Sequence, residues 1–186
     1  VIDSINMTAQ EANVSIGTGD TKVIERTKGD GLYITTAGFG KIREGGNTDG
    51  KRIEKGDVIL INGNIADHGL AVMSVRENLG IKTTIKSDAS PLNGLIKTVL
   101  DSGADVKFMR DPTRGGVANV LADLVEITNL SIEIDESGLP ISAGSRHLSE
   151  LLGLDPLTVA NEGKVVMVVS ASDSERVLGA LKGHHY

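Results

Sequence analysis

The pattern of apolar and polar positions predicts helices that alternate with short strands along most of the chain. Apolar residues recur every three to four positions in the segments that we expect to be helical, which are residues 1–12, 67–79, 90–102, 112–128, 145–152 and 173–181. Runs rich in β-branched residues predict strands at residues 14–16, 31–42, 57–63, 106–109, 130–134 and 164–170. This alternation favours an α+β fold, a mixed sheet with packed helices.

A polar, glycine-rich stretch divides the chain into two parts. It contains Gly45-Gly46-Asn47 and Asp49-Gly50, residues that are typical of turns and loops. We therefore predict a first domain at residues 1–43, a linker or hairpin loop at residues 44–56, and a second domain at residues 57–186. The strand expected at residues 31–42 is long enough to pair with a second subunit. Because the chain starts at Val1 and runs directly into helical periodicity, we expect it to begin inside a longer protein.

Composition and charge exclude several classes of function. The net charge of −6, with no Trp and only two Tyr and two Phe, argues against nucleic acid as a partner, because binding it needs basic surfaces and stacking platforms. The absence of Cys excludes disulfides and thiolate chemistry within these residues, and is compatible with a cytoplasmic protein. No apolar run approaches the length of about 20 residues that spans a bilayer, so no membrane association is expected.

The first candidate for chemistry is the loop at residues 17–23, Gly-Thr-Gly-Asp-Thr-Lys-Val. Its glycines permit close backbone approach, Asp20 is suited to hold Mg²⁺, and Lys22 is suited to neutralise phosphate charge. The alternative is an ordinary tight turn in which Asp20 caps local N–H groups and Lys22 is exposed.

The second candidate is Asp111-Pro112-Thr113-Arg114-Gly115-Gly116, which follows a predicted strand and opens a predicted helix. Asp111 is suited to cap the helix. The free backbone N–H groups of the helix start, together with Thr113 and Arg114, are donors for a phosphate, a carbamoyl oxygen or a carboxylate. Two glycines in a first helical turn cost about 1 kcal/mol each relative to Ala and so need a local reason. That reason is either a bound ligand or tight packing of the helix on the sheet.

Two further segments carry polar residues at the ends of elements. Asn161 and Glu162 precede the strand at residues 164–170, where Glu162 is placed to act as a base or metal ligand, unless the segment is an ordinary turn. Asp67 opens a helix and is expected to cap it, and we expect His68 to be a structural residue rather than a catalyst.

Taken together, four motifs resemble the HypE family of hydrogenase maturation proteins in order and spacing over nearly the whole chain. They are Gly19-Asp20-Thr21-Lys22-Val23, Ala66-Asp67-His68-Gly69, Asp111-Pro112-Thr113-Arg114-Gly115-Gly116, and Leu154-Asp155-Pro156-Leu157 with Asn161-Glu162-Gly163-Lys164. This family belongs to the PurM-like superfamily of aminoimidazole ribonucleotide synthetase and selenophosphate synthetase. The resemblance places residues 1–43 at the end of an ATP-binding, dimer-forming domain and residues 57–186 in most of the second domain.

The resemblance implies an ATP-dependent carbamoyl dehydratase of [NiFe] hydrogenase maturation. In that family ATP and Mg²⁺ bind between the domains and subunits of a homodimer. ATP activates the oxygen of an S-carboxamide that the enzyme carries on its own terminal cysteine. Loss of phosphate then leaves the thiocyanate from which the cyanide ligands are made. The implied partners are the carbamoyltransferase HypF and the HypC–HypD iron-cyanide scaffold complex.

The resemblance also assigns roles to residues. It implies that Glu162, Lys22 and Arg114 are catalytic and that Asp20 binds the metal. The residues that it implies contact the nucleotide or the substrate are Gly19, Asp20, Thr21, Lys22, Asp111, Thr113, Gly115, Gly116 and Asn161.

This sequence departs from the family pattern at several points. The cysteine-bearing tail is absent, so we expect this polypeptide to be inactive by itself. Ala66 stands where the family commonly has Gly, and Ala89 where it often has Cys. The rival hypotheses are a related ATP-dependent synthetase or small-molecule kinase, such as selenophosphate synthetase, and a non-catalytic binding module.

Overall fold

The computed structural model describes residues 1–29, 31–43, 46–76 and 83–184, and the chain divides into two compact units. Unit 1 is Val1–Gly46 and unit 2 is Asn47–Tyr186. By its contacts, the later part of the predicted linker belongs to unit 2. Asp49 forms a β-bridge with Phe108, and Arg52 pairs with Asp105 and donates to the Val106 carbonyl.

Unit 1 consists of one helix followed by extended chain. Helix α1 (Ile2–Glu11) confirms the helix predicted there. The strands predicted at residues 14–16 and 31–42 are wrong, since no strand is formed in the part of unit 1 that the structure describes. A β-branched sequence becomes a strand only when a neighbour takes up its N–H and C=O groups, and the described residues of this unit supply no such partner.

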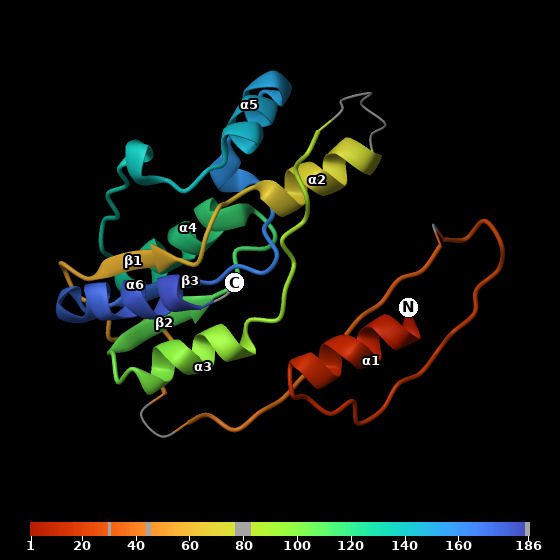
Figure 1. The fold of residues 1–186 in the computed structure, drawn as a ribbon, viewed down its shortest axis with the longest axis horizontal. Coiled ribbons are helices and arrows are strands. Elements are labelled where there is room, and N and C mark those ends of the chain that lie inside the picture. The colour runs from red at the N-terminus through yellow and green to blue at the C-terminus, as the bar shows by residue number, and fades with distance from the viewer. Residues whose placement is uncertain (30, 44–45, 77–82, 185–186) are drawn as a thin grey trace. The chain divides into compact units, whose positions relative to one another are not determined.

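Unit 2 is built on a three-stranded antiparallel sheet in the order β1-β3-β2 (Figure 1). The central strand is β3 (Val166–Val169), which pairs with β1 (Val58–Ile61) and β2 (Val106–Arg110). All of its residues are buried. An apolar run of this kind is expected of a strand covered on both faces.

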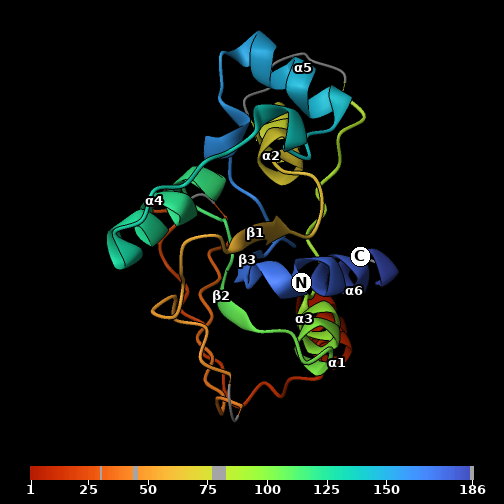
Figure 2. The ribbon, with the colours of Figure 1, turned by 90° about the vertical axis from the view of Figure 1, so that its left-hand side faces the viewer.

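Helices cover both faces of the sheet. Helix α4 (Gly116–Thr128) packs on the face that presents Val166 and Val168, while α3 (Asn93–Asp101) and α6 (Ser174–Gly183) pack on the face that presents Met167 and Val169. Figure 2 shows α4 apart from α3 and α6, on opposite sides of the strands. The predicted α+β class is confirmed, with every described strand pair antiparallel.

A third apolar cluster lies beside the sheet. Helices α2 (Asp67–Arg76) and α5 (Ala143–Leu152) pack together through Leu70 and Leu148. The short 3₁₀ helices are Glu136–Gly138, Pro156–Thr158 and Ala171–Asp173. Residues 77–79, where we predicted the end of the α2 helix, lie outside the described residues. Within the described ranges, no helix is long and apolar enough to cross a membrane.

The strand predicted at residues 130–134 is the one wrong strand of unit 2. These residues run as chain without strand pairing and, together with β1 and α4, line an apolar groove of about 910 Å³. The alternating pattern of the segment is that of a strand, but a strand also requires hydrogen bonds to a neighbour, and among the described residues this segment forms none with the outer edge of β1 or of β2.

Candidate functional site

Three loops of unit 2 meet at the side chain of Asn161, which is 2% exposed. Its Oδ1 accepts a hydrogen bond from the Ala66 backbone N–H at 2.7 Å. Its Nδ2 donates to the carbonyls of Pro112 (3.2 Å) and Val159 (2.9 Å), and its backbone N–H also donates to Pro112. A buried amide satisfied in this way fixes the segments that it bonds. The turn before α2, the loop before α4 and the segment before β3 are thereby held together.

Asn161 was predicted to contact the cofactor. Both hydrogens of its side-chain amide are instead donated to backbone carbonyls within the protein. Its geometry is that of a residue that positions the loops around it. Glu162, the next residue, is exposed and carries its carboxylate at this corner.

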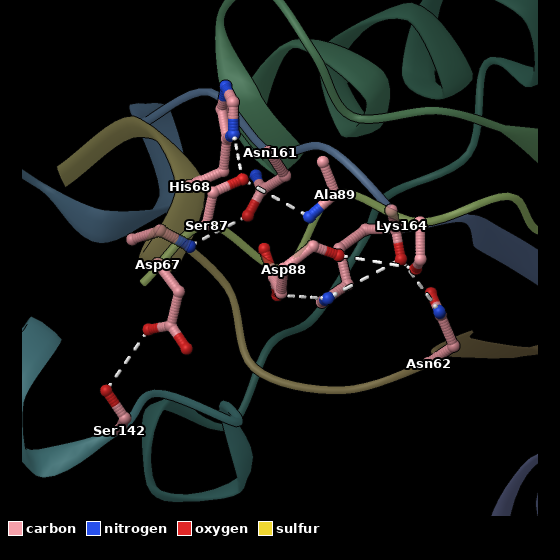
Figure 3. Close-up of polar contacts among 12 residues, drawn as sticks. Asn62, Asp67, His68, Ser87, Asp88, Ala89, Ser142, Asn161 and Lys164 are labelled. Atoms are coloured by element: carbon pink, nitrogen blue, oxygen red, sulfur yellow. Dashed lines mark hydrogen bonds and ion pairs between the residues drawn. The ribbon is translucent and has the colours of Figure 1, made fainter. Parts of the chain in front are cut away.

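The segment that carries Glu162 is clamped on its other side by residues 87–90. Gly163 has φ +63° and lies so close to that segment that a Cβ atom would stand 2.2 Å from the Asp88 carbonyl oxygen. The Lys164 ammonium, whose side chain is 7% exposed, forms an ion pair with the Asp88 carboxylate. Asn62 closes the corner, since its Nδ2 donates to the Gly163 carbonyl and its Oδ1 accepts from Val165 N–H (Figure 3). Glu162 is therefore an exposed carboxylate on a rigid support.

The turn before α2 presents Asp67 and His68. Asp67 is the first residue of α2, and its Oδ1 accepts hydrogen bonds from the hydroxyls of Ser142 and Ser145. These bonds connect α2 to the start of α5. The Nδ1 of His68 lies 2.8 Å from Ser87 Oγ (Figure 3). Ala66, which precedes them, has φ +74°. That is the left-handed region, which Gly adopts without steric cost. This gives a physical reason for the Gly that is common at this position in the family.

The loop before α4 differs from its prediction at the helix start. We expected Asp111 to cap a helix beginning at Pro112, but α4 begins at Gly116 with Gly115 as its N-cap residue. Asp111 accepts a hydrogen bond from Thr113 Oγ1 instead. Gly115 and Gly116 both have positive φ, which is not the backbone conformation of an α-helix. The helix therefore starts about one turn later than a cap at Asp111 followed by Pro112 predicts.

Gly116 lies too close to another backbone segment to carry a side chain. A Cβ atom there would stand 2.3 Å from the Leu157 carbonyl oxygen and 2.6 Å from that of Val159, so α4 packs directly on the backbone of residues 157–159. Close packing therefore accounts for Gly116. Arg114, beside it, is exposed, and no ion pair of its side chain is found among the described residues.

The remaining predicted residues lie in unit 1. Asp20 Oδ1 accepts a hydrogen bond from Thr21 N–H at 2.8 Å, which is the local turn capping that we weighed against a metal site. Gly19, Asp20, Thr21 and Lys22 are all exposed, and a Cβ at Gly19 would meet nothing within 4 Å. The structure describes each unit by itself, so the roles that the resemblance implies for Asp20 and Lys22, beside Arg114 and Glu162 of unit 2, stay predictions.

Sequence reasoning missed the residues that support the site. Ser87, Asp88 and Asn62 lie outside the four motifs, and Lys164 was noted only as the last residue of one motif and the first residue of a predicted strand. Their importance comes from contacts across 76 positions for Asp88 and Lys164, and across 101 for Asn62 and Gly163.

The comparisons with known proteins find relatives over nearly the whole chain. Residues 54–186 match the model of the family described as AIR synthase related protein, C-terminal domain. The chain is 46% identical over 184 residues to a putative hydrogenase expression/formation protein of Methanocaldococcus jannaschii and 41% identical over 184 residues to carbamoyl dehydratase HypE of Escherichia coli. Each alignment covers 99% of this chain and 54% of the relative, so the chain spans about half the length of these curated relatives.

Solved structures give the same result at the level of the fold. A HypE–HypF complex contains a chain that is 42% identical, with a TM-score of 0.89 over all of this chain and 61% of that one. A HypE in complex with ATP is 32% identical, with a TM-score of 0.85 over 97% of this chain and 54% of that one. The chain therefore belongs to the family of AIR synthase related proteins, of which it carries the C-terminal domain, and its similarity to HypE extends over nearly all of its length.

Proposed function

We propose that this chain provides the central part of an ATP-dependent carbamoyl dehydratase that acts in hydrogenase maturation. The observation that carries the proposal is the similarity to carbamoyl dehydratase HypE across 99% of the chain, which includes every motif of the site in unit 2. The reaction converts an S-carboxamide on a cysteine into a thiocyanate, from which the cyanide ligands of the hydrogenase metal site are made. With no Cys among its 186 residues, the chain cannot carry that group itself, and we expect it to be inactive alone.

Glu162 is the residue to which we assign proton removal. Forming a nitrile from a carboxamide requires the amide nitrogen to lose its protons while the carbon–oxygen bond breaks. An exposed carboxylate held by a clamped backbone is suited to accept such a proton. Asn161, Gly163 and Lys164 hold the segment around it and so act as positioning residues.

Arg114 and Thr113 supply positive charge and a hydroxyl next to the start of α4. Their donors suit a phosphate or a carbamoyl oxygen, and Gly115, which is exposed, leaves the backbone accessible next to the start of α4. Asp111 orients Thr113 through the hydrogen bond between their side chains.

The loop at residues 19–22 has the donor set that a nucleotide with Mg²⁺ requires. Mg²⁺ prefers carboxylate oxygens, and phosphates attract ammonium groups and exposed backbone N–H groups. Asp20 and Lys22 are exposed, and the space around Gly19 is open. We assign Asp20 to the metal and Gly19, Thr21 and Lys22 to the phosphates. When bound, ATP supplies the phosphoryl group that makes the amide oxygen a good leaving group.

The partners follow from the same assignment. One of the similar structures is a HypE–HypF complex, and we propose that the protein receives its carbamoyl group from HypF, passes its product to the HypC–HypD scaffold complex and works as a homodimer.

A chimera tests this function. The chain would replace the matching 184-residue span of the Escherichia coli carbamoyl dehydratase, which supplies the cysteine tail, and would be assayed with HypF, a carbamoyl donor for HypF, and ATP. We expect the tail to lose the mass of one water molecule with release of ADP. Changing Glu162→Gln should lower the rate by about 10²–10⁴-fold, the range for a general base.

Glu175→Gln is the matched control, because Glu175 is an exposed glutamate of α6 outside the site. Its rate should equal that of the unchanged chimera. A folded chimera that binds ATP but never dehydrates the tail would contradict the proposal. ATP turnover without dehydration would favour the related synthetase or kinase.

A further inference from the structure

The imidazole of His68 is held at one ring nitrogen and free at the other. Its Nδ1 lies 2.8 Å from Ser87 Oγ. Within the described part of the chain, Nε2 makes no hydrogen bond, and Figure 3 shows it on the side of the ring that faces away from Ser87.

The partners of Ser87 indicate which nitrogen carries the proton. Ser87 Oγ accepts a hydrogen bond from Ala89 N–H, so one of its lone pairs is used. Ser87 is exposed, so its own hydroxyl proton can also go to solvent, but among the residues that the structure describes Nδ1 of His68 is the acceptor in reach. When Ser87 donates to Nδ1, the neutral ring carries its proton on Nε2, which becomes a hydrogen-bond donor.

His68 lies at the same corner as Glu162. It stands between Ala66, whose N–H donates to Asn161 Oδ1, and Gly69, whose N–H donates to the Ala160 carbonyl. The turn that carries His68 is therefore bonded on both sides of it to the segment directly before Glu162. The Nε2–H donor and the exposed carboxylate come from two backbones that are fixed to each other.

We propose that His68 is a further catalytic residue, whose Nε2–H donates a hydrogen bond to the oxygen of the carbamoyl-derived group. The inference rests on the proposed function. In the reaction the amide oxygen receives the phosphoryl group of ATP as ADP departs, the carbon–oxygen bond breaks with its electron pair leaving on the phosphate, and the nitrogen loses its two protons, one to Glu162 and one to water, to form the nitrile. His68 transfers no proton. Its donor stabilises the charge that grows on the departing oxygen.

Ser87 is a positioning residue in this arrangement, because it sets the orientation and tautomer of the imidazole without touching the substrate. Two variants separate its effects. Ser87→Ala removes the donor to Nδ1, and Ser87→Thr keeps a hydroxyl at the same place.

The tautomer can be measured in the 186-residue chain itself. Two-bond ¹H–¹⁵N correlation spectra distinguish a ring protonated on Nε2 from one protonated on Nδ1, with His68→Gln used to assign the signal. We expect the Nε2–H form of His68 in the unchanged chain, a mixture in Ser87→Ala, and the Nε2–H form again in Ser87→Thr. Finding the Nδ1–H form in the unchanged chain overturns the inference.

Activity is measured in the chimera described above. His68→Ala should lower kcat by about 10²-fold, as for removal of one oxyanion donor, with little change in the KM for ATP. His68→Gln should retain more activity, because the glutamine amide can place an N–H near the position of Nε2. His147→Ala is the matched control, since His147 is exposed on α5.

The two proposals fail in different ways. If the unchanged chimera does not dehydrate the tail, the proposed function fails, and the tautomer measurement still decides the orientation of His68. If the unchanged chimera is active and His68→Ala stays within twofold of it, the proposed function stands and the inference about His68 is overturned.

Discussion

Single residues in this chain act through backbone space as much as through side-chain chemistry. Gly116 and Gly163 both have positive φ and both lie against the carbonyl oxygens of another segment. Each therefore meets two demands at once, a left-handed conformation and the lack of a Cβ atom. Asn161 acts through its side chain instead: its amide forms hydrogen bonds that hold together three segments that are distant in sequence.

Gly163→Ala should destabilise unit 2 far more than Gly153→Ala. The two glycines have nearly the same φ, +63° and +66°, so each change brings a left-handed alanine that costs about 1 kcal/mol. Only at position 163 does the new methyl group collide with a backbone oxygen, that of Asp88. We expect a further loss of about 2 kcal/mol there.

Urea unfolding of the two variants, followed by circular dichroism, measures the difference. Equal losses of unfolding free energy would show that the contact between residues 163 and 88 does not constrain the folded chain.

At the scale of elements, helices and strands that depend on the local residue pattern were predicted from the sequence. Elements whose formation or start depends on contacts with distant segments were missed. Helix α5 was predicted within two residues, because Ser142 caps it locally by accepting from Ser145 N–H. The strand predicted at residues 130–134 was wrong because a strand needs a neighbour that its own residues do not specify. The start of α4 was misplaced because Gly116, its first residue, is set by contact with residues 157–159.

The site shows the same division between local pattern and distant contact. The motifs around residues 67, 111 and 161 were found from the sequence, and the structure brings these loops together in unit 2. That Asn161 joins them, and that Asp88 pairs with Lys164, depends on contacts no local pattern contains.

A buried ion pair connects the two outer strands, and breaking it should be costly. Lys107 is the extra residue of a β-bulge in β2, and its ammonium pairs with Asp57 at 2.9 Å, each side chain being 8% exposed. Lys107→Met would leave the Asp57 carboxylate buried without its cation. We expect a loss of about 3–5 kcal/mol in unfolding free energy.

Lys97→Met is the matched control, because Lys97 forms an exposed pair with Asp101 on α3 and should change stability by less than about 0.5 kcal/mol. The double variant Lys107→Met with Asp57→Asn should recover part of the loss. Similar urea midpoints for both single variants would contradict a structural role for the buried pair.

A carboxylate that connects β2 to α6 makes stability depend on pH. Asp173 accepts hydrogen bonds from Asp105 N–H at 2.9 Å and Ser170 Oγ at 3.0 Å and lies near Arg176, and these contacts lower its pKa below the ordinary 3.8. Because the folded-state pKa is lower than the unfolded one, the carboxylate stabilises the fold above the unfolded pKa, and this contribution is lost as pH falls through the folded pKa.

Asp173→Asn should therefore lower the unfolding free energy at pH 7, and the difference from the unchanged chain should shrink as the pH is brought below 3.8. Chemical denaturation at several pH values measures this. A difference that is the same at pH 7 and at acidic pH would remove Asp173 as its source.

At the scale of the whole molecule, the two units differ in how much holds them together. Unit 2 has three apolar clusters around a sheet, whereas none of the apolar residues of α1 is buried in the part of unit 1 that is described. We predict that residues 47–186 fold without unit 1. A polypeptide of these residues should unfold cooperatively in urea, with a midpoint close to that of the same transition in the whole chain.

The absence of a cooperative transition in that polypeptide would show that residues 1–46 are needed for the sheet to form. A cooperative transition would instead support the start of unit 2 at Asn47, ahead of the residue 57 expected from the glycine-rich stretch.

The place of β3 in the sheet sets an order of events during protein synthesis. This strand joins β1 to β2, yet it is the last of the three to leave the ribosome, more than a hundred residues after β1. Until Val169 has emerged, the apolar strands already made have no central strand to join. A translating ribosome therefore displays β1 and then β2 without their central strand while the residues up to Val169 are added, which makes the nascent chain a natural client for chaperones that bind exposed hydrophobic segments.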